Sequence, residues 1–235
     1  MKNYKKIARI AGAWYLAFIF LGAFSVMFID DSLTVVGDAS ATIKNLRTNQ
    51  TLFLFGIIAY IAGYVCFIFV ANNLSKLFNQ SNSYTPITPD DRLSVPPYNR
   101  LIILMKIFVY SGVALALACK VSQVIAAIFS NIKYLVFYET GSVAASIFWG
   151  LWLFPLGLLI FKSGLMPKTI GALLLGACAA NLVEFLLLFI APNTPEAILT
   201  VCYIVGMKGE FSLVLWLLIK GVNNKNERDA TLYPD

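Results

Sequence analysis

Apolar residues fill six stretches of this chain, each long enough for the roughly 20 residues that a helix needs to cross a bilayer. Polar or charged residues stand at both ends of every stretch. The pattern predicts an all-α polytopic membrane protein, a bundle of six transmembrane helices forming one domain over residues 1–222. The predicted spans are residues 7–29, 52–77, 101–130, 139–161, 169–191 and 197–219.

The first stretch is interpreted as an uncleaved helix and not as a signal peptide. It runs for about 23 residues, whereas the apolar core of a signal peptide is typically about 7–15 residues long. It ends in the sequence Phe28-Ile29-Asp30-Asp31, which is a poor cleavage site. We expect Asp30 and Asp31 to mark the end of this helix at the outer boundary of the membrane.

The connections between the spans differ in character. Residues 39–46 are predicted to form a short amphipathic helix at the membrane surface. Residues 79–100 hold four prolines, which forbid a regular helix, and are predicted to be an extended cytoplasmic loop. A docking segment for a partner protein is the alternative for this loop. Residues 131–138 are expected to be a short connection, and residues 223–235 a polar cytoplasmic tail.

The distribution of basic residues predicts the orientation. Placing both termini in the cytoplasm puts twelve of the 18 Lys and Arg residues on the cytoplasmic side and three outside, with the other three inside spans. Cytoplasmic segments of membrane proteins carry an excess of Lys and Arg. The turn from Lys162 to Lys168 is one of the basic cytoplasmic segments. The predicted location is the bacterial cytoplasmic (inner) membrane, with both termini in the cytoplasm.

Composition agrees with this topology and excludes several classes of function. The chain is 59% hydrophobic and 13% charged, whereas a soluble domain is about half apolar and about a quarter charged. The net charge of +6 comes from basic residues scattered at segment ends, so nucleic acid is not an expected partner. The expected partners are the lipid bilayer and other proteins, bound through the 79–100 loop or the spans.

Three short blocks of sequence carry a family resemblance: Ala8–Gly12, Gly157–Gly164 and Gly209–Leu213. In order and spacing they resemble the bacterial six-helix membrane family catalogued as domain of unknown function 4386. The resemblance implies six spans and supplies no reaction, ligand or cofactor. Two departures stand out: the 79–100 loop is longer than the usual link, and Lys120 stands where members often carry an arginine.

Charged residues inside the spans are the sharpest candidates for a site. Each costs about 2.5–3.5 kcal/mol at mid-span and should therefore face a partner. Lys120, Glu184, Lys208 and Glu210 fall between the midplane and the outer leaflet, and their charges sum to zero. The simplest arrangement pairs Glu184 with Lys120 or Lys208. Such a network either holds spans three, five and six together or lines a polar path for a small solute or protons.

Three further polar residues are secondary candidates. Asn181 lies one turn before Glu184, Gln123 follows Lys120 by three residues, and Glu139 lies at the outer interface. Each could belong to either a structural network or a polar path.

The residue types that most enzymes need are scarce. The chain has no histidine, and its four cysteines stand alone in apolar runs, so neither a metal site nor a cofactor is expected. No common catalytic motif occurs. The expected function is that of a non-enzymatic membrane protein, an accessory or structural subunit of a larger assembly. The alternative is a small-solute or proton-coupled transporter, and a less favoured one is a lipid-modifying enzyme with Glu184 and Glu210 as acids.

Overall fold

The computed structural model describes residues 4–82, 98–191 and 194–222, and within these ranges all regular structure is helical. Six helical segments there are long and apolar enough to cross a membrane. The predicted all-α fold is thereby confirmed, and so is the presence of six helices that could serve as spans. The central part of the predicted 79–100 loop and the whole predicted tail, residues 223–235, lie outside the described residues.

The first span is built from three consecutive helical pieces. An α-helix, α1, covers Tyr4–Ala23; a π-helix, η1, covers Phe24–Asp30; and a final turn, α2, covers Asp31–Leu33. The short helix α3 follows at Ala39–Thr48. The oxygen of the Asp38 side chain caps α3 by accepting a hydrogen bond from the Ala41 N–H at 2.9 Å. This confirms that the segment predicted as a short helix, residues 39–46, is helical.

The remaining spans are α4 (Gln50–Asn82), α5 (Tyr98–Phe129), α6 (Ile132–Leu151) with α7 (Leu153–Ser163), α8 (Lys168–Ile190) and α9 (Glu196–Ile219). The predicted connection at residues 131–138 is wrong, because α6 already begins at Ile132. The Asn131 side chain accepts a hydrogen bond from the Lys133 N–H at 3.0 Å and so caps the helix early.

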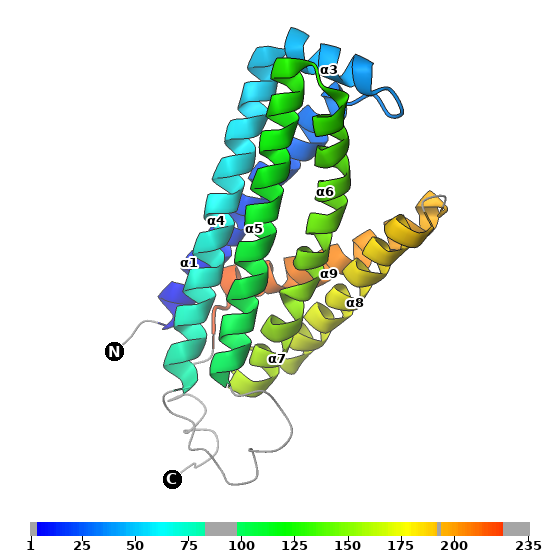
Figure 1. Cartoon of the computed structure of the whole chain (residues 1–235). Helices are drawn as coiled ribbons and strands as arrows, with labels where there is room; N and C mark the ends of the chain where they lie inside the picture. Colours follow the sequence, from blue (N-terminus) through cyan, green and yellow to red (C-terminus); the bar gives the residue numbers. More distant parts are fainter. Residues whose placement is uncertain (1–3, 83–97, 192–193, 223–235) are drawn as a thin grey trace, which may run out of the picture.

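Figure 1 shows α1, α4, α5 and α6 side by side, with α3 lying across one end of this group. The α8–α9 hairpin leans away from α6 towards its tip. At the end opposite α3, Gly221 follows α9 and lies against Lys5 of α1. The described beginning and end of the chain therefore lie at the same end of the bundle.

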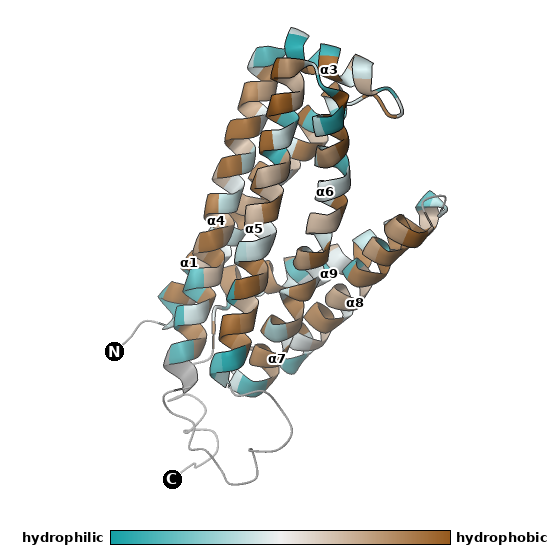
Figure 2. Ribbon diagram, in the orientation of Figure 1, coloured by the Kyte–Doolittle hydropathy of each residue, from teal (hydrophilic) through white to brown (hydrophobic). Residues whose placement is uncertain are grey.

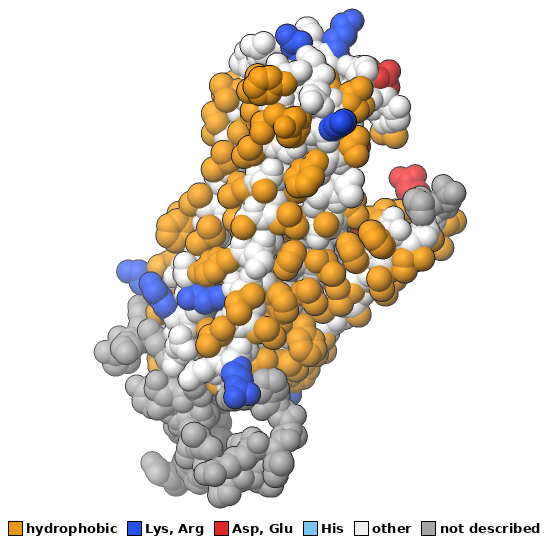
Figure 3. Space-filling model, in the orientation of Figure 1, with side chains coloured by type: hydrophobic (Ala, Val, Ile, Leu, Met, Phe, Trp, Pro, Cys, Tyr) orange, Lys and Arg blue, Asp and Glu red, His pale blue; other side chains and the backbone are white. Residues whose placement is uncertain are grey.

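Apolar side chains cover the flanks of the bundle, and polar ones gather at its two ends. Figure 2 shows this along the ribbons, and Figure 3 shows Lys and Arg side chains above and below an apolar surface. In the interior, Gly56 of α4 lies against Ile29, where an added Cβ would come within 2.7 Å of a side-chain atom. Small residues at such contacts let helices approach closely within a bilayer.

Candidate functional site

Lys120, one of the predicted intramembrane charges, forms a buried ion pair with Asp30. The Nζ atom lies 2.7 Å from Oδ2 and 2.9 Å from Oδ1 of Asp30, and the side chains are 4% and 6% exposed. Nζ also donates a hydrogen bond to Oε1 of Gln123 at 2.8 Å. Charges buried this deeply are tolerated only when they are paired and hydrogen-bonded. The α1 span and α5 are joined by this pair.

Two tyrosine rings enclose the same ammonium group. Nζ lies 4.6 Å from the ring centroid of Tyr60 and 5.2 Å from that of Tyr138, both within the range of a cation–π interaction. The Tyr138 hydroxyl also donates to Oδ2 of Asp30 at 3.3 Å. We call Asp30, Lys120, Gln123, Tyr60 and Tyr138 the Lys120 centre. It gathers side chains from η1, α4, α5 and α6, and its formal charge is zero.

The π-helix η1 is what turns Asp30 inward. The Asp31 N–H bonds to the carbonyl of Val26, five residues earlier, so residues five apart share a face. Ser25 and Asp30 are five apart and both are buried. In an α-helix they would point about 140° apart. The Ser25 hydroxyl donates to the Gly56 carbonyl at 3.0 Å and fixes η1 against α4.

Helix α3 covers the Lys120 centre at its end of the bundle. Ile43 of α3 packs with Ala126 and Leu135, beside the partly buried Tyr138. Leu46 of α3 packs in a second apolar cluster that includes Ile29, the neighbour of Asp30. The ion pair is therefore separated from the polar surface by apolar side chains.

A second interhelical contact between polar side chains lies between α1 and α9. The hydroxyl of Tyr15 donates to Oε2 of Glu210 at 2.5 Å. The Tyr15 side chain is fully buried, and its ring lies 5.8 Å from that of Trp152. Glu210, a predicted site residue, thus binds a residue of the first span and is not part of the Lys120 centre.

We expect replacement of Tyr15 by phenylalanine to lower the free energy of unfolding by about 1–3 kcal/mol, because the half-buried Glu210 carboxyl loses its hydrogen-bond donor. Denaturant unfolding of the detergent-solubilised protein measures the loss. Tyr110→Phe is the matched control, since the hydrogen bond from the Tyr110 hydroxyl to Asn72 Oδ1, at 2.8 Å, is exposed. Equal losses for the two variants would contradict a special role for the Tyr15–Glu210 contact.

The other predicted site residues are dispersed. Glu184 and Asn181 are half-buried on α8, Lys208 is exposed on α9, and Glu139 is exposed on α6. The predicted pairing of Lys120 with Glu184 is wrong, because Lys120 reaches across to Asp30. Between described residues, Glu184 and Lys208 form no ion pair. The predicted four-charge network is therefore divided among separate places.

The sequence interpretation missed Asp30, Tyr15, Tyr60 and Tyr138. The sequence pattern predicts Asp30 to be the end of a helix, although it is an acid in the same half of the bundle as Lys120. The charge balance between the first and third spans could have identified this pair. The tyrosines gave no separate signal, because aromatic residues are abundant throughout the spans.

The chemistry available at the Lys120 centre is that of a closed polar contact. Oε1 of Gln123 is used by Lys120, while its Nε2 atom has no hydrogen-bond partner within the described part of the chain. In the same part, no three His, Cys, Asp or Glu side chains gather in a way that could hold a metal ion. The arrangement can tie four helical segments together and leaves one amide donor unused.

The chain has relatives of unassigned function. An uncharacterized protein of Archaeoglobus fulgidus is 39% identical over 75 residues, which cover 32% of this chain and 43% of that protein. The match thus covers less than half of that relative's length. No solved structure matches the chain.

A family profile matches most of the sequence. It is described as "Domain of unknown function (DUF4386)" and matches residues 10–86 and 101–221. The matched ranges include every residue of the Lys120 centre and of the Tyr15–Glu210 contact. The chain therefore belongs to the DUF4386 family, and it is an integral membrane protein with six candidate spans.

Proposed function

We propose that this protein is a non-enzymatic subunit of a membrane assembly, and that it binds a transmembrane helix of a partner protein through α9. The observation that carries the proposal is the position of Lys208. This lysine is exposed, and it lies twelve residues from Glu196 and eleven from Ile219, the two ends of α9. A charge at the middle of a span and on its outer surface requires a partner.

Lys208 lies too deep in the predicted span for its ammonium group to reach the membrane surface. Eleven residues of helix measure about 17 Å, and a tilt of about 40° still leaves a depth of about 13 Å. The four-carbon stem of a lysine is much shorter than that. In lipid, the charge would cost about 2.5–3.5 kcal/mol on insertion scales. A carboxylate on a neighbouring helix removes most of this cost.

The surroundings of Lys208 have the form of a helix-binding stripe. Five exposed apolar residues lie three, four, seven or eleven positions from it and so share its face of α9. They are Val201, Ile204, Val205, Leu215 and Ile219. Other faces are occupied, since Gly209 lies against α8 and Glu210 bonds to Tyr15 of α1. The stripe predicts a partner helix that is apolar except for one Asp or Glu at mid-span.

The orientation belongs to the same proposal. The bias of Lys and Arg supports a cytoplasmic location for both termini, and α3 would then lie on the opposite side of the membrane. The bacterial cytoplasmic membrane remains the proposed location, and the archaeal relative extends the possible hosts beyond bacteria. The partner helix would then run beside α9, away from the Lys120 centre.

Transport of a small solute or of protons is a second candidate. It is favoured by the unused Nε2 donor of Gln123, which is buried beside Lys120. A solute with a hydrogen-bond acceptor could use this group. The closed packing of α3 over the centre favours the subunit role, in which the ion pair is structural.

Co-purification from the native host tests the subunit role. We expect full-length protein and the Lys208→Arg variant to recover the same stoichiometric partner in mild detergent, and Lys208→Leu to recover at least tenfold less. The partner should carry an Asp or Glu in a membrane helix, and exchanging this acid for Lys should restore binding to Lys208→Glu. Lys106→Leu, in α5, is the matched control and should retain the partner.

Two results would contradict the proposal. One is equal recovery of the partner by wild type and Lys208→Leu. The other is a single monodisperse species from every variant, and a small molecule bound to that species would instead favour transport.

A further inference from the structure

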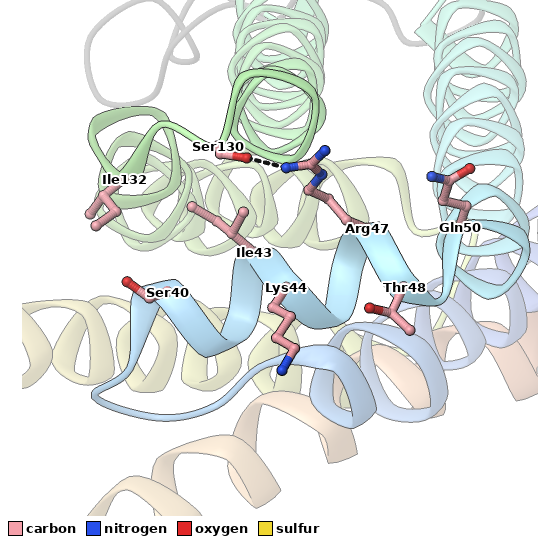
Figure 4. Close-up of a pocket in the computed structure, with 8 residues that line it drawn as sticks. All are labelled: Ser40, Ile43, Lys44, Arg47, Thr48, Gln50, Ser130 and Ile132. Atoms are coloured by element: carbon pink, nitrogen blue, oxygen red, sulfur yellow. Dashed lines mark hydrogen bonds between the residues drawn. The ribbon is translucent and has the colours of Figure 1, made fainter.

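A hollow of about 510 Å³ opens on the outer surface of α3, at the end of the bundle opposite the described chain ends. Figure 4 shows it bounded by α3 and by the turn between α5 and α6. Six polar residues line it: Ser40, Lys44, Arg47, Thr48, Gln50 and Ser130. Two of the lining residues are cationic and none is acidic, so the hollow favours an anion.

Arg47 is held in place across this hollow. One guanidinium nitrogen donates to the hydroxyl of Ser130 at 2.6 Å, from α3 to the α5–α6 turn. Ser130 has a positive φ of 52°, a conformation that a residue other than glycine adopts only at some cost. The turn thus places the hydroxyl where it fixes the guanidinium, whose remaining N–H groups are suited to binding phosphate oxygens. Lys44, on another edge of α3 in Figure 4, adds positive potential.

An apolar surface adjoins the polar hollow. A second hollow of about 420 Å³ shares Thr48 and Gln50 with the first and extends over Leu52 and Phe55 of α4. Phe55 is 58% exposed and Leu52 is 39% exposed. Both lie at the start of a membrane-spanning helix. A ligand that fills both hollows would have an anionic head and an apolar tail.

We propose that this paired hollow binds a phospholipid, with its phosphate at Arg47 and an acyl chain over Leu52 and Phe55. Arg47 is the principal phosphate ligand, because its guanidinium is fixed by Ser130. Ser40, Thr48 and Gln50 supply hydrogen bonds for the rest of the headgroup. A soluble phosphate would use the cationic groups but would gain nothing from the apolar side. The bound headgroup would also tie α3 to the α5–α6 turn, above the Lys120 centre.

Thermal unfolding of the full-length protein, delipidated in a neutral detergent, tests the proposal. We expect short-chain phosphatidylglycerol to raise Tm by about 3 °C or more, since a ligand that binds only the folded state stabilises it. Glycerol phosphate and inorganic phosphate at the same concentration should raise Tm by less than a third as much. Arg47→Gln should lose most of the lipid shift, whereas Lys133→Gln, an exposed lysine on α6 that does not line the hollow, should retain it.

Native mass spectrometry provides the second measurement. Wild type should retain one phospholipid per chain under conditions in which Arg47→Gln retains at least fivefold less. A lipid shift in Arg47→Gln equal to that of wild type would overturn the proposal. An equal shift with inorganic phosphate would also overturn it, because the ligand would then be a soluble anion.

Discussion

Replacing Lys120 with methionine is expected to lower the free energy of unfolding by about 3–5 kcal/mol, the cost of removing one partner from a buried ion pair. Methionine fills a similar volume but leaves the Asp30 carboxylate without its ammonium partner. The hydrogen bond from Tyr138 at 3.3 Å is then the remaining side-chain donor to Asp30 among the described residues. An uncompensated carboxylate in the interior is among the most destabilising single changes.

Asp30→Asn is expected to destabilise less than Lys120→Met. In Asp30→Asn, Lys120 would retain its hydrogen bond to Gln123 and its contacts with the two tyrosine rings. In Lys120→Met, by contrast, Asp30 retains only the 3.3 Å hydrogen bond from Tyr138 among the described residues. The double variant Asp30→Asn with Lys120→Met should recover at least half of the stability lost by Lys120→Met, since no isolated charge remains.

Denaturant unfolding in detergent micelles measures all three variants. Lys106→Met is the matched control, because Lys106 lies near the start of α5 and outside the Lys120 centre. If the loss of unfolding free energy in the double variant equals the sum of the losses in the two single variants, a direct Asp30–Lys120 interaction is contradicted.

Replacing Gly209 with valine is expected to disrupt the packing of α8 on α9, at a cost of about 1–3 kcal/mol or more. A Cβ at position 209 would come within 2.6 Å of Ala177 Cβ and 2.8 Å of the Leu173 carbonyl oxygen. The backbone atom cannot move without moving α8. The strain therefore falls on the contact between the two helices, and we expect α9 to move away from α8 around this position.

Gly176→Val is the control for this change. It lies on α8, and an added Cβ there would meet nothing within 4 Å, so its stability should stay close to that of wild type. Thermal unfolding in detergent compares the two variants. A Gly209→Val protein as stable as Gly176→Val would show that the α8–α9 contact is not the close one described.

The spans could be predicted from the sequence because each is a local property. A helix that crosses the hydrocarbon core must bond its own backbone and present apolar side chains for about 20 residues. The boundaries are less accurate: the predicted start of the fourth span at residue 139 is wrong, because Asn131 caps a helix that begins at Ile132. A cap depends on one side chain, which hydropathy does not detect.

The candidate site could be predicted only in part. Lys120 and Gln123 are three residues apart on one helix, and their contact follows from that spacing. The acidic partner came from the first span, ninety residues away, and depended on η1. The wider π-helical turn η1 changes the face of the helix on which Asp30 lies. The hydropathy of an apolar run does not predict where such a turn occurs. Glu184 was the more plausible partner by depth along the span alone.

The sequence by itself determined that the chain is all-α, has six helices long and apolar enough to cross a membrane, and carries a few costly charges within them. These properties follow from the length, hydropathy and polarity of single segments. Only the tertiary structure decided which charges meet. In the tertiary structure Lys120 forms a buried ion pair with Asp30, the Tyr15 hydroxyl donates a hydrogen bond to Glu210, and Lys208 lies exposed on the outer face of α9. The reason is that pairing depends on helix order, rotation and tilt, which are fixed by packing between segments distant in sequence.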